Sequence, residues 1–102
     1  MKLKRLYKEI IEEGIKADIR SKKEIQLILE ERKRLYEKSE NKEFFDLDSL
    51  FNPFSDTRVL NGDLEAEIKT MIVGIDVDVA EMLFVDMLKK SNIDIDLVIS
   101  HH

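Results

Sequence analysis

Two continuous apolar runs, one on each side of a capped helix, constrain the fold more than any other feature of this sequence. The first run covers residues 68–76 and the second covers residues 95–100. Between them, Asp78 and Glu81 have the spacing of a capping box, which predicts a helix over residues 79–90. The first run changes from alternating to continuous apolar, and a continuous apolar stretch is typical of strands buried on both faces, as in parallel sheets. Both runs are therefore predicted to be strands of one parallel sheet.

Strand, helix and strand in this order predict a β-α-β unit over residues 70–100. We expect Ile72 and Leu97 to lie in neighbouring parallel strands joined by a right-handed crossover. Ligands bind such sheets at the carboxyl ends of the strands, where this chain has Asp76 and the pair His101–His102. No glycine-rich phosphate loop follows either strand, so neither a dinucleotide site nor a P-loop is predicted.

The first part of the chain predicts two helices. Apolar residues spaced three and four apart indicate a helix over residues 2–13, with Gly14 closing it as a C′ glycine. Ser21 and Glu24 have capping-box spacing at the start of a longer helix over residues 22–39. That longer helix either forms an antiparallel hairpin with the first one or projects to contact another protein chain.

The middle of the chain predicts an apolar loop followed by a β-hairpin. Residues 40–56 hold four of the five phenylalanines. A loop of this composition either packs on the core, which we favour, or forms an aromatic ligand-binding box. Residues 57–60 are β-prone and Asn61–Gly62 is a strong turn signal, so a loose hairpin should precede the first long strand.

These elements together predict an α/β fold in a single domain, since 102 residues suit one domain. An N-terminal helical hairpin comes first, then a β-hairpin and the β-α-β unit, which form a small mixed three-layer sheet. Residues 1–42 are the expected helical segment. Residues 57–102 are the expected β-β-α-β half that carries the candidate site.

Composition excludes several classes of protein. The chain has no cysteine, which excludes disulfides, thiolate metal sites and a cysteine nucleophile. No apolar run approaches the roughly 18 residues of a membrane span, and no signal peptide is recognisable. We therefore expect a cytoplasmic protein without a membrane partner.

Charge is distributed unevenly along the chain. Residues 1–42 carry 13 Lys and Arg against 9 Asp and Glu, whereas residues 43–102 carry 4 against 13. The acidic part disfavours nucleic acid and suits cations. The basic run Arg32–Arg34 has glutamates beside it, so a solvated helix face is favoured over a nucleic-acid surface.

The terminal His101–His102 pair is the sharpest chemical feature. Neutral imidazole is the commonest metal ligand, and carboxylates complete hard or borderline sites. Adjacent residues of a strand point to opposite faces, so both histidines serve one ion only if the strand has ended. The dipeptide alone is more typical of a tag remnant or a solvated terminus than of a metal site.

Three segments resemble one known family when they are taken in order. They are Ile72–Asp76, Ala80–Leu83 and Asp96–His102, which read as a strand ending in Asp, a helix, and a strand ending in Ser-His-His. This pattern resembles the NGG-one-interacting-factor-three family of dinuclear-metal-centre proteins, also described as type-two-like GTP cyclohydrolase I. The turn at Val59–Asp63 and the segment Asn52–Arg58 look most like the archaeal branch.

The resemblance implies that His101 and His102 each help to ligate an ion of a two-metal site, with Zn²⁺, Ni²⁺, Fe²⁺, Mn²⁺ or Co²⁺ as candidates. The family's remaining ligands lie in later segments, so these 102 residues look like its N-terminal portion and should bind metal weakly or not at all. Family members also resemble ring-shaped homo-oligomers. Asp76 and Asp78 are candidates for orienting a histidine. Alternatively, Asp76 simply ends its strand and Asp78 caps the helix, which we favour for Asp78. Asp56 and Arg58 either line a pocket mouth or form a surface ion pair.

Three functions are therefore distinguished. The first is the N-terminal part of a metal-dependent, hydrolase-like enzyme of undefined substrate, in which two ions activate water. The second is a non-catalytic, metal-dependent interaction or regulatory protein, for which the helix over residues 22–39 offers a partner surface. The third, disfavoured, is a nucleic-acid binder.

Overall fold

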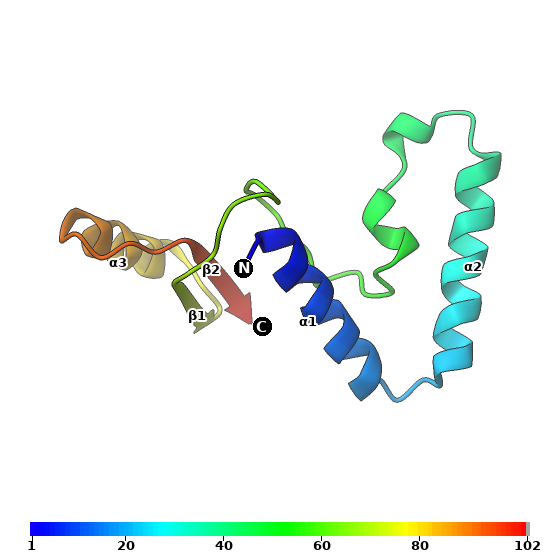
Figure 1. Cartoon of the computed structure of the whole chain (residues 1–102), viewed down its shortest axis with the longest axis horizontal. Coiled ribbons are helices and arrows are strands. Elements are labelled where there is room, and N and C mark those ends of the chain that lie inside the picture. The colour runs from blue at the N-terminus through cyan, green and yellow to red at the C-terminus, as the bar shows by residue number, and fades with distance from the viewer. Residues whose placement is uncertain (102) are drawn as a thin grey trace. The chain divides into compact units, whose positions relative to one another are not determined.

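The computed structural model describes residues 1–101, with three α-helices, two short 3-10 helices and one pair of strands (Figure 1). In chain order the elements are α1 (Leu3–Ala17), α2 (Lys22–Lys38), η1 (Lys42–Phe44), η2 (Leu47–Leu50), β1 (Met71–Ile75), α3 (Val79–Lys90) and β2 (Leu97–His101). The chain divides into two compact units, described separately below. Unit 1 comprises Met1–Arg5 with Gly62–His102, and unit 2 comprises Leu6–Asn61.

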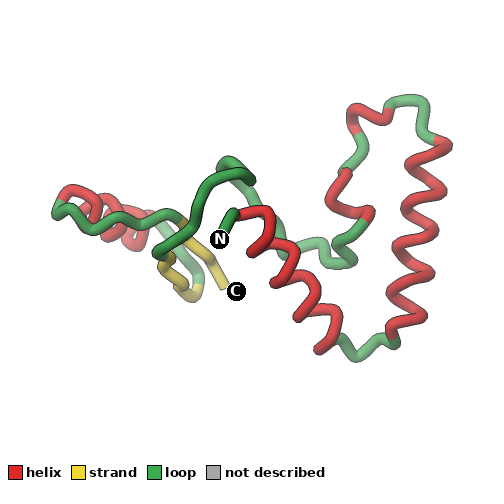
Figure 2. Tube along the Cα trace, in the orientation of Figure 1, coloured by secondary structure: helices red, strands yellow, loops and turns green. Residues whose placement is uncertain are grey.

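The predicted mixed α/β class is confirmed, with helices first and a small parallel sheet after them (Figure 2). Within the described residues the sheet has two strands, β1 and β2, and they run parallel. Ile72 lies opposite Val98, and Met71 lies opposite Leu97. The prediction that Ile72 and Leu97 belong to neighbouring parallel strands is therefore confirmed.

Helix α3, which connects the two strands, begins and ends where the sequence predicts. Asp78 and Glu81 form the complete capping box: the Glu81 amide donates to the Asp78 carboxylate, and the Asp78 amide donates to Glu81 Oε2 at 2.8 Å. The Val79 amide also donates to Asp78 Oδ1 at 2.7 Å. Lys89 and Lys90 occupy the last turn, where cations interact favourably with the helix dipole. The helix turns Val85 into the interior of unit 1.

The expected β-hairpin before β1 is not formed in the described part of the chain. Residues 57–60 are irregular, and the segment before β1 pairs with the N-terminus instead. Lys2 and Glu67 form an isolated antiparallel bridge, and the Ile68 amide donates to the Met1 carbonyl at 2.8 Å. A strand needs a partner with free backbone groups, and residues 1–4 supply it through contacts that no local sequence signal encodes.

Helix α1 is longer than predicted, because Gly14 lies inside it rather than closing it. The helix continues to Ala17. A Cβ placed on Gly14 would lie 2.9 Å from Cε2 of Phe54, so the absent side chain leaves room for that aromatic ring. Within unit 2, the glycine permits close packing of the apolar loop on the helix, and it has no role as a helix stop signal.

Helix α2 begins as predicted, with the Ser21 hydroxyl accepting the Glu24 amide at 3.1 Å. Its principal packing partner is η2. The loop of residues 42–58 therefore lies between the two helices of the expected hairpin, α1 and α2 (Figure 1). Phe51 packs edge-on against Tyr7 of α1, with ring centroids 5.6 Å apart. Phe45 makes a similar contact with Tyr36 of α2 at 5.2 Å. The preference for a packed loop over a ligand-binding aromatic box is consistent with these contacts.

A buried polar network fixes this loop, and the sequence does not predict it. Asn52 is fully buried and donates through Nδ2 to the Tyr7 hydroxyl at 2.9 Å and to the Thr57 carbonyl at 2.7 Å. The Tyr7 hydroxyl donates in turn to Asp48 at 2.9 Å. From α2, Arg32 donates to the Asn52 carbonyl at 2.8 Å. Burial raises the pKa of Tyr7 above its ordinary value, which keeps its proton available for the Asp48 bond.

Candidate metal-binding edge

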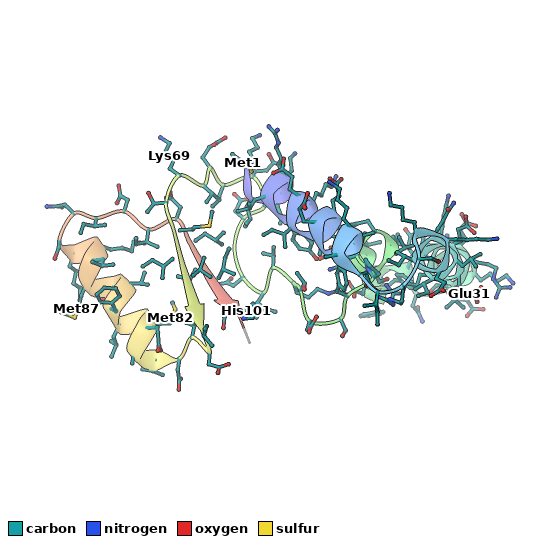
Figure 3. The ribbon with its side chains drawn as sticks, turned by 90° about the horizontal axis from the view of Figure 1, so that it is seen from below. Met1, Glu31, Lys69, Met82, Met87 and His101 are labelled. Carbon is teal, nitrogen blue, oxygen red and sulfur yellow. The ribbon has the colours of Figure 1, made fainter. Side chains whose placement is uncertain are left out.

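The carboxyl ends of β1 and β2 bring two of the predicted site residues to one edge of unit 1. Ile75, the last residue of β1, lies opposite His101 in the strand register. The ladder then continues by one bond, because the Asp76 amide donates to the His101 carbonyl at 2.9 Å. Asp76 and His101 are thus joined through their backbones at the edge where parallel sheets bind ligands. Figure 3 labels His101 at this end of β2.

The turn after β1 is held in a defined conformation. Asp76 has a φ of 52°, the left-handed region, which reverses the chain direction directly after the strand. The next amide, that of Val77, donates to the Ser100 hydroxyl at 3.2 Å. Val77 also packs so closely over Gly74 that a Cβ there would lie 2.9 Å from its Cγ2 atom. These contacts position Asp76 on a fixed turn, beside an exposed His101.

Asp78 lies two residues further on, but it has a structural role. Its carboxylate accepts the Val79 amide and completes the capping box of α3. The interpretation of Asp78 as a helix cap, rather than as a group orienting a histidine, is therefore supported by its hydrogen bonds.

The donors at this edge suit a metal ion in type but not in number. Imidazole and carboxylate are ligands for zinc-like ions, and a catalytic site takes at least three protein ligands. Across residues 1–101 no group of three or more His, Asp or Glu side chains is arranged to hold a metal. His102, the second predicted ligand, lies outside the described residues. The described edge therefore presents a partial donor set, and no chemical step can be derived through a metal here.

The other two candidate residues, Asp56 and Arg58, belong to unit 2. Arg58 forms an ion pair with Asp46 at 2.9 Å and donates to the Phe54 carbonyl at 3.1 Å. These bonds support a structural ion pair for Arg58. Asp56 is exposed in the irregular segment after η2.

Unit 2 also contains an open groove of about 420 Å³ between α2 and η2. Leu29, Tyr36 and Leu50 contribute its apolar surface, and Glu30 and Lys33 are among its charged residues. The groove has one aromatic residue and no cluster of catalytic groups, so its lining resembles an ordinary protein surface.

Comparisons with protein-family models, with curated proteins and with solved structures find no significant match to this chain. The predicted family resemblance thus has no support beyond the residues on which it is based. Among the described helices, none is long and apolar enough to cross a membrane.

Proposed function

We propose that this chain is a divalent-metal-binding protein whose ligands lie at the carboxyl ends of β1 and β2. His101 and His102 are the proposed imidazole ligands, and Asp76 is the proposed carboxylate. The observation that carries the proposal is the backbone bond of 2.9 Å between the Asp76 amide and the His101 carbonyl, which joins both residues at one edge. The resemblance to the NGG-one-interacting-factor-three family supports the two histidines as ligands.

The proposed binding is weak in these 102 residues. Two imidazoles and one carboxylate leave the coordination shell open. Hydrolysis by a two-metal centre, which the family resemblance implies, requires more ligands than this donor set contains. Metal binding is accordingly the proposed function, and catalysis is left to a more complete donor set.

The imidazole nitrogens provide a direct test, because His101 and His102 are the only two histidines in the sequence. Two-dimensional ¹H–¹⁵N spectra of the side chains should therefore contain two sets of imidazole signals. Titration with Zn²⁺ should shift both sets progressively, as expected for a ligand in rapid exchange. Replacing either residue, by His101→Ala or His102→Ala, should reduce the shift of the histidine that remains.

Two aspartates form a matched pair of controls. Asp76→Asn should weaken Zn²⁺ binding, because it removes a charged oxygen at the proposed edge. Asp94→Asn makes the same chemical change at an exposed residue between α3 and β2 and should leave the titration unchanged. Imidazole signals that do not respond to excess Zn²⁺, or equal losses in both aspartate variants, would refute the proposed site.

A further inference from the structure

Helix α3 has an exposed apolar stripe on the face opposite its buried one. Val85 is buried within unit 1. Val79, Leu83 and Met87 recur every four residues and therefore lie along one helix face. Their exposed fractions are 69%, 58% and 66%. We call these three residues the α3 stripe.

The flanks of the α3 stripe are apolar as well. Met82 and Phe84 lie on its two sides and are 50% and 56% exposed. In Figure 3, Met87 extends from the side of α3 that faces away from the strands of unit 1. A helix that is apolar around most of its circumference is normally buried on both sides. The stripe thus has the composition of an interface.

The charges of α3 are segregated toward its two ends. Asp76 and Asp78 precede or cap its first turn, whereas Lys89 and Lys90 occupy its last turn. Beside the stripe, Asp86 forms an ion pair with Lys90 at 2.9 Å. The helix therefore has an acidic end, an apolar centre and a basic end.

We propose that a second copy of this chain covers the α3 stripe, with the two α3 helices antiparallel. With Leu83 on the two-fold axis, each Val79 lies opposite the Met87 of the other copy. The same arrangement brings the last turn of each copy, which contains Lys89 and Lys90, close to Asp78 at the start of α3 in the other copy. The surface is then self-complementary in both apolar contacts and charge, as a two-fold symmetric interface requires.

Charge also selects the direction of pairing. A parallel pair would set the acidic end of each helix against the acidic end of the other, and likewise the two basic ends. An antiparallel pair replaces these repulsions with attractions, and the two helix dipoles oppose one another. This self-association is independent of metal binding, so each proposal can fail without the other.

Sedimentation equilibrium of the full chain in EDTA, which excludes metal bridging, tests the association. The wild-type chain should sediment with twice the 12.0 kDa mass of one chain. Leu83→Glu should return it to a monomer while its circular dichroism stays unchanged, because Leu83 is exposed. Leu60→Glu is the matched control at a loop leucine that is 93% exposed, and it should leave the dimer intact. A monomeric wild-type chain overturns the proposal.

Single cysteines test the direction of pairing, because the chain has none of its own. With diamide as the oxidant, Leu83→Cys should form a covalent dimer. Val79→Cys and Met87→Cys should each cross-link poorly alone but efficiently when mixed. Leu60→Cys is the control for random collision. Efficient cross-linking of Val79→Cys or Met87→Cys alone indicates parallel pairing and overturns the antiparallel arrangement.

Discussion

At the scale of single residues, Glu65 has the most clearly perturbed environment in unit 1. Its carboxylate accepts hydrogen bonds from Lys2 Nζ at 2.8 Å and from Lys4 Nζ at 2.7 Å. These two bonds lower the pKa of Glu65 from 4.5 to about 2. The side chain thereby ties the first residues of the chain to the segment before β1. All three groups are exposed, so solvent and salt screen their attraction.

We expect Glu65 to contribute stability above pH 4.5 and to lose that contribution as the pH falls toward 2. The sign follows from the lowered pKa, because the folded chain holds the carboxylate ionised while the unfolded chain protonates it. Glu65→Gln should lower the free energy of unfolding at pH 7, and its difference from wild type should vanish at low pH. Urea unfolding across this pH range measures the effect.

The matched control for Glu65 is Glu40→Gln, which alters an exposed glutamate between α2 and η1. The difference in the free energy of unfolding between this control and wild type should not change with pH over the same range. If the free energy of unfolding of Glu65→Gln differs from that of wild type by the same amount at every pH, the two lysine bonds do not govern the stability of this segment.

At the scale of elements, the contact between α1 and the apolar loop determines how unit 2 is packed. A glycine inside a helix costs about 1 kcal/mol relative to alanine, so its presence at position 14 needs a compensating contact. That contact is the ring of Phe54, whose nearest atoms would be 2.9 and 3.1 Å from a Cβ at position 14. Close packing of the ring therefore outweighs helix propensity at this site.

We expect Gly14→Ala to destabilise the chain, by up to about 2 kcal/mol, in spite of the better helix propensity of alanine. The added methyl group displaces the Phe54 ring and strains the loop. Urea unfolding of Gly14→Ala, of Phe54→Ala and of the double variant gives a double-mutant cycle. In the Phe54→Ala background the same Gly14→Ala change should become stabilising, because the ring is gone. A stabilising effect of Gly14→Ala in the wild-type chain would contradict this explanation.

At the scale of the whole molecule, apolar surface remains uncovered on unit 1. The exposed side chains alternate along β1, at Met71, Val73 and Ile75, in addition to the α3 stripe. A parallel sheet is ordinarily covered on both faces. Unit 1 therefore presents the kind of surface that association with a further copy of the chain would bury.

We expect charge reversal at the basic end of α3 to weaken self-association. In the proposed dimer, Lys89→Glu combined with Lys90→Glu places two acidic groups near Asp78, at the start of α3 in the other copy. The dimer dissociation constant should rise, and its difference from wild type should shrink in high salt, which screens exposed charges over about 10 Å at 0.1 M. Sedimentation velocity at two salt concentrations measures this. An unchanged dissociation constant would remove the charge argument for antiparallel pairing.

Local sequence signals determined the parts of the fold that depend on neighbouring residues. The limits of α3 follow from the capping pair Asp78 and Glu81 and from the last-turn lysines, all within thirteen residues. The start of α2 follows from Ser21 in the same way. The two apolar runs predicted β1 and β2, and with them the edge at which Asp76 and His101 meet, because a short helical connection favours parallel pairing.

Contacts between distant residues decided the rest. Residues 57–60 had the composition of a strand, but a strand forms only where a partner offers unpaired backbone groups, and the N-terminal residues pair with the segment before β1 instead. The sequence around Gly14 predicts a helix end, but in the structure Gly14 lies inside α1, where the Phe54 ring packs against it. No local sequence signal marks Asn52 as buried, although its amide is the centre of a buried network.

The sequence by itself thus determined the α/β class, the capped helices and the parallel strands, because each depends on periodicity or capping within one segment. Only the tertiary structure decided which segment pairs with the N-terminus, where α1 ends and how the apolar loop is held. Those features depend on contacts between different segments of the chain, as with Tyr7 and Asn52, and no local pattern specifies which segments meet.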